Sequence, residues 1–270
     1  MMEQPKNNLK IVSEKKNSRM ILPNMLTLIG VCIGLTSIRF ALDAKFELAI
    51  VAIIFAALID GLDGRIARLI KGTSQVGKEL DSLTDMISFG VAPAFIMYFW
   101  KLNSLGKFGW LLCLIYVICV ALRLARFNIG TGQAPSWKDN FFEGVPSPAG
   151  GILVLTPLIF SLSGLEIFKV NYDIIVPVFF IATSLLLISK LPTYSFKKIV
   201  IQRSTTIFLL FGIVLFFGML LIYTFEVLAI SSLIYILLIP VSYLHFQKIK
   251  KVNNENDSNN TENDNLEDVL

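Results

Sequence analysis

The sequence predicts an all-α integral membrane protein, a polytopic bundle of about eight transmembrane helices with both termini in the cytoplasm. Of its 270 residues, 54% are hydrophobic and only 16% are charged, and the mean hydropathy is +0.68. These values lie outside the range of soluble globular domains. The apolar residues also gather in runs of about 20, the length that a helix needs to cross a bilayer.

Eight apolar runs are candidate spans, and short polar connections separate most of them. They cover residues 21–41, 46–70, 80–100, 107–129, 149–168, 173–191, 205–224 and 227–246. Residues 1–20 form a polar, basic N-terminal segment, and 21–248 form one membrane-embedded domain. Residues 249–270 are polar and acidic without apolar periodicity, which predicts a disordered C-terminal tail.

The basic residues set the orientation of the spans. Nineteen of the 24 Lys and Arg residues fall in the two tails and in alternate connections, and five fall on the other side. Cytoplasmic loops carry an excess of positive charge, so both termini and the connection near residue 72 are expected on the cytoplasmic side of the cell membrane. Because the basic residues lie at span ends and not on one polar face, we expect no nucleic-acid partner.

Four carboxylates interrupt the second and third runs, where a charge costs roughly 2.5 to 3.5 kcal/mol on insertion scales. Asp60 and Asp63 share one face of a helix at i, i+3, and Asp81 and Asp85 share a face of the next at i, i+4. The connection between the two helices is short and contains Gly72. We therefore expect antiparallel neighbours whose acidic faces meet at the cytoplasmic end of the bundle.

Carboxylates at close range need compensating positive charge. Two divalent cations would balance four carboxylates, and oxygen ligands favour the hard ions Mg²⁺ or Mn²⁺. Such a pair suits phosphoryl chemistry, with Gly64 and Gly77 leaving room for a ligand and Arg68 available to a phosphate. The alternative is that the carboxylates are interfacial charges that pair with nearby bases, namely Arg65, Arg68, Lys71 and Lys78.

The spacing Asp-x2-Asp-Gly-x2-Ala-Arg-x8-Gly-x3-Asp-x3-Asp runs from Asp60 to Asp85. It resembles the signature of the CDP-alcohol phosphatidyltransferase family. The resemblance implies that Asp60, Asp63 and Asp81 are metal ligands, and that Asp85 is the general base and a ligand of a second metal. It also implies contacts with the CDP-lipid, in this chain from Asn24, Thr27, Gly64, Arg68, Ser74 and Gly77.

Two further segments bear on the acceptor alcohol. The segments 123–128 and 144–150 resemble the branch of the family that uses serine, and Arg123 and Arg126 share a helix face at i, i+3. A guanidinium group binds a carboxylate well, and serine carries one. The residues implicated in serine binding are Arg123, Arg126, Asn128, Pro146 and Ser147. The alternative is that the two arginines are cytoplasmic anchors of their helix.

The resemblance implies transfer of a phosphatidyl group from CDP-diacylglycerol to L-serine, which gives phosphatidylserine and CMP in phospholipid biosynthesis. It also implies membrane lipids as surroundings and a homodimer. A sibling enzyme that uses glycerol 3-phosphate, an inositol phosphate or choline stays open. More distant alternatives are a divalent-cation transporter, since intramembrane acids mark ion pathways, and a structural membrane scaffold.

Overall fold

The computed structural model describes residues 14–70, 75–129, 141–165, 171–194 and 203–267, and most of them are helical. The first half of the chain forms four rods in sequence order. They are α1 (Glu14–Leu42), α2 (Phe46–Leu69), the continuous rod α3 (Gln75–Asp85), π-helix η1 (Met86–Val91) and α4 (Ala92–Trp100), and then, after the 3₁₀ turn η2 (Leu102–Leu105), α5 (Lys107–Ile129). The second half adds α6 (Ser147–Ser163), α7 (Tyr172–Ile188), α8 (Arg203–Ile222) and α9 (Thr224–Glu267).

The predicted all-α membrane bundle is confirmed, since each of the eight apolar runs coincides with one of these rods. Over the described residues, four helical stretches are long and apolar enough to cross a membrane. They are Ile21–Leu42, Gln75–Trp100, Lys107–Ile129 and Thr224–Ile249. The apolar parts of α6, α7 and α8 are shorter, and α2 carries Asp60, Asp63 and Arg65 near its end. The number of spans and the side of the termini stay predictions.

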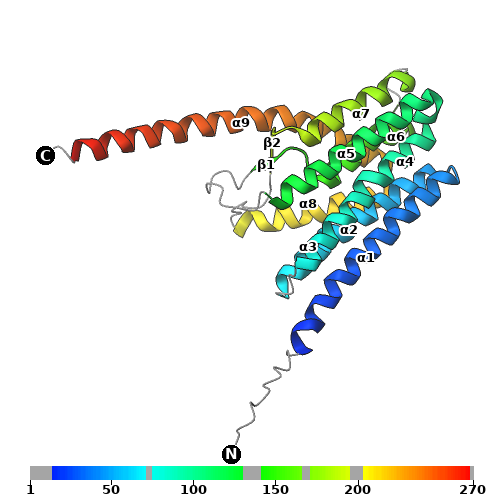
Figure 1. Cartoon of the computed structure of the whole chain (residues 1–270), viewed down its shortest axis with the longest axis horizontal. Coiled ribbons are helices and arrows are strands. Elements are labelled where there is room, and N and C mark those ends of the chain that lie inside the picture. Colours follow the sequence, from blue (N-terminus) through cyan, green and yellow to red (C-terminus); the bar gives the residue numbers. More distant parts are fainter. Residues whose placement is uncertain (1–13, 71–74, 130–140, 166–170, 195–202, 268–270) are drawn as a thin grey trace, which may run out of the picture.

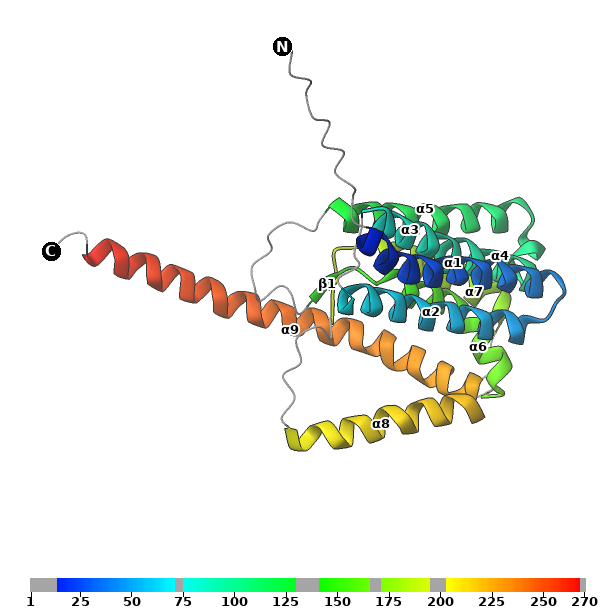
Figure 2. The same ribbon diagram turned by 90° about the horizontal axis from the view of Figure 1, so that it is seen from below.

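The helices α1 to α7 run roughly side by side in one bundle (Figure 1). The helix α8 packs on α9, and α9 packs along α6 before its C-terminal half leaves the bundle (Figure 2). Large side chains fill the interior, and Tyr116, Phe89 and Phe180 are fully buried. The outside is apolar as well, as Phe208 and Leu221 on α8 illustrate with about three quarters of their surface exposed. An exposed apolar surface of this extent suits lipid.

The helix α1 approaches the α3–η1 rod closely through two glycines at i, i+4. A Cβ atom at Gly34 would lie 2.5 Å from Ser88 Oγ and 3.1 Å from Ser88 Cα. At Gly30 a Cβ would lie 3.3 Å from the Thr84 side chain. Small residues in this spacing allow helix backbones to approach inside a membrane, so α1 is held directly against the segment that carries Asp81 and Asp85.

Two features differ from the sequence prediction. A two-stranded antiparallel pair, β1 (Phe141–Glu143) and β2 (Pro192–Tyr194), joins the segment before α6 to the segment after α7. The chain is also helical through Glu267, where the sequence predicts a disordered tail. Between Pro240 and Glu267 there is no Gly or Pro, and adding residues to an existing helix costs far less than starting a new one.

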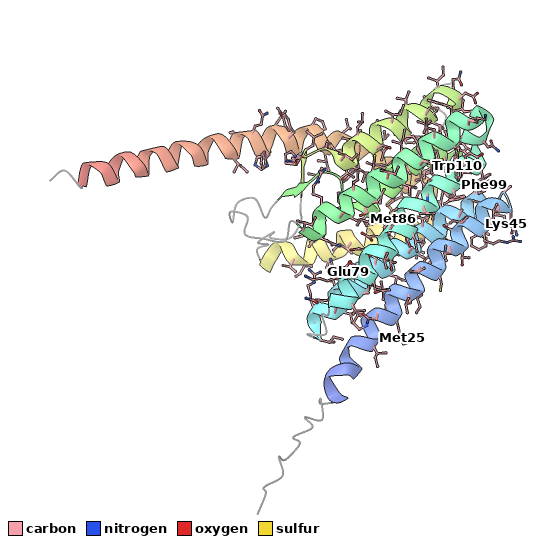
Figure 3. The ribbon with its side chains drawn as sticks, in the orientation of Figure 1. Met25, Lys45, Glu79, Met86, Phe99 and Trp110 are labelled. Carbon is pink, nitrogen blue, oxygen red and sulfur yellow. The ribbon has the colours of Figure 1, made fainter. Side chains whose placement is uncertain are left out.

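The two ends of the bundle differ in character. One end carries the ion pairs Lys101–Asp173 (2.9 Å) and Arg39–Asp43 (3.3 Å), together with an aromatic contact between Trp100 and Tyr172. In Figure 3, Lys45, Phe99 and Trp110 lie at this end, and Met25 and Glu79 lie at the other. The candidate site residues belong to the end marked by Met25 and Glu79.

Candidate active site

Three carboxylates meet where α2 ends and α3 begins. Asp60, Asp63 and Asp81 each offer an oxygen, and these oxygens lie within 4.8 Å of one another. Asp63 is buried, with 3% of its surface exposed. Two of the three come from α2 and one from α3, as the helical spacing predicts.

A residue of α1 completes this cluster. The Thr27 hydroxyl lies 2.7 Å from Asp63 Oδ2 and 3.0 Å from the carbonyl oxygen of Pro23. Because a hydroxyl has one hydrogen, we assign it to the shorter bond, whose acceptor is charged. Thr27 therefore fixes the orientation of Asp63.

The fourth carboxylate, Asp85, has different partners. Ser147 Oγ donates a 3.0 Å hydrogen bond to Asp85 Oδ2 and accepts one from the Arg123 guanidinium. Ser147 is fully buried and Arg123 is 8% exposed. This chain of Arg123, Ser147 and Asp85 uses the single hydroxyl hydrogen once, and it joins α5, the first residue of α6 and the end of α3. Asp85 also interacts electrostatically with Asp60, so the two parts of the site adjoin.

Several buried polar atoms in the site have no hydrogen-bond partner among the described residues. They include one oxygen of Asp63, one oxygen of Asp85 and Nε of Arg123. Leaving such an atom unsatisfied costs about 1–3 kcal/mol. The two described ion pairs lie at the opposite end of the bundle, so among these residues no base forms an ion pair with a carboxylate of the site. Orphaned carboxylate oxygens in an all-oxygen cluster fit a hard divalent cation.

The acidic faces of α2 and α3 meet as expected, since oxygens of Asp60 and Asp63 on α2 lie within 4.8 Å of one of Asp81 on α3. Both helices pack mainly on α1, and α2 also contacts η1 and α4 of the rod that α3 begins. The glycine face of α1 lets that helix sit close to the α3–η1 rod, and Thr27 of the same helix reaches Asp63 on α2. The antiparallel sense is retained, because α2 ends where α3 begins (Figure 1).

The residues predicted to contact the CDP-lipid surround the acidic cluster unevenly. A Cβ at Gly64 would meet nothing within 4 Å, so the protein itself leaves this position open. Arg68 is exposed, and its Nε donates a 3.0 Å hydrogen bond to the Gly64 carbonyl. Asn24 is half-buried one turn before Thr27, and Gly77 is half-buried one turn before Asp81. Ser74 lies outside the described residues.

The residues predicted to bind serine separate into two groups. Arg123 and Ser147 lie in the site, and Pro146 is the extended residue that precedes α6. Arg126 instead donates a 2.7 Å hydrogen bond to the carbonyl of Ile188, at the end of α7. Asn128 is exposed and donates a 3.0 Å hydrogen bond to Ser82 of α3. Arg126 and Asn128 thus tie helices together at the edge of the site.

Two features of the site have no counterpart in the sequence prediction. Asp85 immediately precedes the π-helix Met86–Val91, a rare geometry that is frequent at functional sites. Tyr116 donates a 2.8 Å hydrogen bond to the Phe89 carbonyl in that segment. Tyr235 of α9 also interacts electrostatically with Arg123. No sequence motif predicts a role for either tyrosine, because each reaches the site only through tertiary packing.

The fold and the site together define a polytopic membrane protein with an acidic, oxygen-rich centre suited to a charged ligand. The CDP-alcohol phosphatidyltransferase family model matches residues 20–239. The chain belongs to this family, as its Asp60 to Asp85 pattern predicts.

Several curated relatives carry the name CDP-diacylglycerol–serine O-phosphatidyltransferase. The Helicobacter pylori (strain 26695) protein is 31% identical over 242 residues, which are 90% of this chain and 98% of the relative. The Mycobacterium leprae protein is 43% identical over 175 residues, 64% of this chain and 57% of the relative. The Saccharomyces cerevisiae protein is 40% identical over 125 residues, 44% and 45% of the two chains. The chain thus spans about half the length of the mycobacterial relatives it matches.

Proposed function

We propose that this protein is a membrane-embedded enzyme that transfers the phosphatidyl group of CDP-diacylglycerol to the hydroxyl of L-serine, giving phosphatidylserine and CMP. The observation that carries the proposal is the buried chain of Arg123, Ser147 and Asp85 beside the cluster of Asp60, Asp63 and Asp81. It sets a guanidinium suited to a carboxylate next to a carboxylate suited to a hydroxyl proton. The relatives named after this reaction support it.

Asp60, Asp63 and Asp81 would hold one divalent cation, Mg²⁺ or Mn²⁺, and Asp85 with Asp60 would contribute to a second. When bound, these ions would balance the carboxylates and stabilise charge on the pyrophosphate. Thr27 keeps Asp63 in one orientation for this task. The open position at Gly64 lets the CDP moiety approach the backbone of α2, and the exposed Arg68 is available to its phosphates.

In the proposed reaction Asp85 accepts the proton of the serine hydroxyl as its oxygen attacks the phosphorus and CMP leaves. Ser147 donates to Oδ2 of Asp85, which leaves Oδ1, the oxygen with no partner among the described residues, to take the proton. Arg123 binds the serine carboxylate through Nε, which is likewise unpartnered there. Held in this way, the serine hydroxyl lies beside Asp85, so proton transfer needs no bimolecular encounter in solution.

The proposal places the site at the cytoplasmic face of the cell membrane. Nineteen of the 24 basic residues are assigned to that side by the alternation of the spans. The carboxylates lie at the bundle end that contains Met25 and Glu79, which belong to the same side in that alternation (Figure 3). At this boundary the acyl chains of the substrate stay in lipid while its phosphates and the serine meet in water.

A panel of acceptors tests the proposal. Purified protein in detergent with CDP-diacylglycerol and Mg²⁺ or Mn²⁺ is given L-serine, glycerol 3-phosphate, inositol phosphate or choline, and CMP is measured. We expect release with serine. Release with another acceptor and not with serine would move the protein to a sibling activity, and metal uptake into proteoliposomes without any CMP release would favour a transporter.

A further inference from the structure

The final helix contributes a polar group to the site. The inward face of α9 follows the spacing Leu228, Ser232, Tyr235, Ile239 and Ser242, which are buried or half-buried. In a helix packed on a membrane bundle, an apolar side chain would serve at each of these positions. The phenol at Tyr235 therefore calls for a polar partner.

The Tyr235 hydroxyl oxygen is buried, and it forms no hydrogen bond of normal geometry within the described part of the chain. Its surroundings are nonetheless polar. Thr193 of β2 lies next to it and uses its own hydroxyl to bind the Gly144 carbonyl at 2.8 Å. Arg123 lies within electrostatic range of the same hydroxyl. Tyr235 of α9 thus lies beside Thr193 of β2 and within electrostatic range of Arg123 on α5.

Three buried atoms without a hydrogen bond of normal geometry among the described residues, Tyr235 Oη, Arg123 Nε and Asp85 Oδ1, belong to side chains that interact through Arg123. Two are hydrogen-bond donors and one is an acceptor. A ligand that satisfies all three carries an anionic oxygen group for the donors and, a few bonds away, a hydroxyl for the acceptor. A hydroxy amino acid has this arrangement, whereas choline lacks the anionic group.

We propose that Tyr235 is a specificity-determining residue that donates a hydrogen bond to the carboxylate of the acceptor, together with Arg123. This inference rests on the proposed function, since it assigns a binding group for its acceptor. The last predicted span then takes part in substrate choice in addition to filling the bundle. A site built around a specific hydrogen bond rejects an analogue that lacks the matching group, because its own polar atoms are then left unpaired.

The test compares Tyr235→Phe with the wild type in the CMP-release assay. The matched control is Tyr243→Phe, which removes the same hydroxyl from an exposed position of the same helix. We expect Tyr235→Phe to raise the KM for L-serine about tenfold or more, the range of a lost hydrogen bond to a charged group. The KM for CDP-diacylglycerol stays unchanged, as do both constants of Tyr243→Phe.

A second measurement guards against loss of folded protein. Serinol replaces the carboxylate of serine by a hydroxymethyl group, and the ratio of kcat/KM for serine and serinol is independent of the active fraction. We expect Tyr235→Phe to lower this ratio about tenfold. If the wild type is active and Tyr235→Phe changes neither this ratio nor the serine KM, the role of Tyr235 is overturned while the proposed function stands. A wild type that releases no CMP with serine would overturn the proposed function, and this inference with it.

Discussion

Thr27 on α1 and Asp63 on α2 are joined by a 2.7 Å hydrogen bond between buried side chains. Asp63 Oδ2 is committed to this bond, and Oδ1 has no partner among the described residues. One oxygen of the carboxylate is thus used to set its orientation and the other is free for a ligand. A helix that carries no acidic residue in its apolar part therefore controls the geometry of the acidic cluster.

Replacing Thr27 by Val should weaken metal binding while the helix packing is retained. The change keeps the side-chain shape and removes a bond to a charged group, so we expect the Mn²⁺ concentration for half-maximal CMP release to rise about tenfold. Thr36→Val is the matched control. Thr36 is an exposed residue of the same helix, and its hydroxyl donates to the Cys32 carbonyl one turn earlier in that helix. Equal metal requirements in the two variants would contradict the assigned role of Thr27.

Ser147→Ala should impair turnover more than substrate binding. The substitution removes the hydroxyl that links Arg123 to Asp85 and leaves both charged groups without that partner. We expect kcat to fall about 10- to 100-fold, the size of a lost hydrogen bond to a charged group. Ser163→Ala, at the other end of α6, removes a hydroxyl that bonds only locally, to Phe160 and Leu165. If kcat falls equally in both, the effect belongs to α6 stability and not to the site.

Two glycine substitutions should separate function from packing. Gly64→Ala meets no atom within 4 Å, so we expect an unchanged melting temperature and a raised KM for CDP-diacylglycerol. Gly34→Ala forces a methyl group against Ser88, and overpacking of this kind costs about 1–3 kcal/mol. We therefore expect a lower melting temperature for Gly34→Ala. A normal KM in Gly64→Ala would show that no ligand approaches that face of α2.

The two arginines of α5 should behave differently. Arg126 holds the Ile188 carbonyl at the end of α7, so Arg126→Ala should lower the melting temperature and change the serine KM by less than about threefold. Arg123→Lys keeps the charge but loses the planar fork, and it should raise the serine KM about tenfold or more. If Arg126→Ala raises the serine KM more than Arg123→Lys does, Arg126 and not Arg123 binds the serine carboxylate, as the sequence alone also allows.

The sequence predicts most of the acidic site, because a helix repeats every 3.6 residues and the spacing of Asp60, Asp63, Asp81 and Asp85 is short-range information. It also predicts the rods, because a run of about 20 apolar residues has few alternatives in lipid. The roles of Arg126 and Tyr235 are different in kind. Their partners lie 62 residues away at Ile188 and more than 100 residues away at Arg123, and no local pattern encodes such contacts.

The close packing of α1 on both acidic helices escapes prediction for a related reason. A short connection predicts that α2 and α3 are neighbours. It does not predict that α1 packs on both, which the fit of Gly34 against Ser88 allows. The π-helix after Asp85 is set by packing as well, since its Phe89 carbonyl is bound by Tyr116 from α5. The pairing of β1 with β2 likewise depends on how α6 and α7 are placed.

Product formation tests the central claim most directly. Purified protein is incubated with CDP-diacylglycerol, isotopically labelled L-serine and Mg²⁺ or Mn²⁺, and the lipid fraction is analysed by mass spectrometry. We expect labelled phosphatidylserine and CMP in equal amounts, loss of both in chelator, and a fall of at least about a thousandfold in Asp85→Asn, the scale of a lost general base. Asp173→Asn, which breaks a salt bridge at the far end of the bundle, should keep full activity. Labelled product formed at the wild-type rate in chelator, or by Asp85→Asn, would contradict the account.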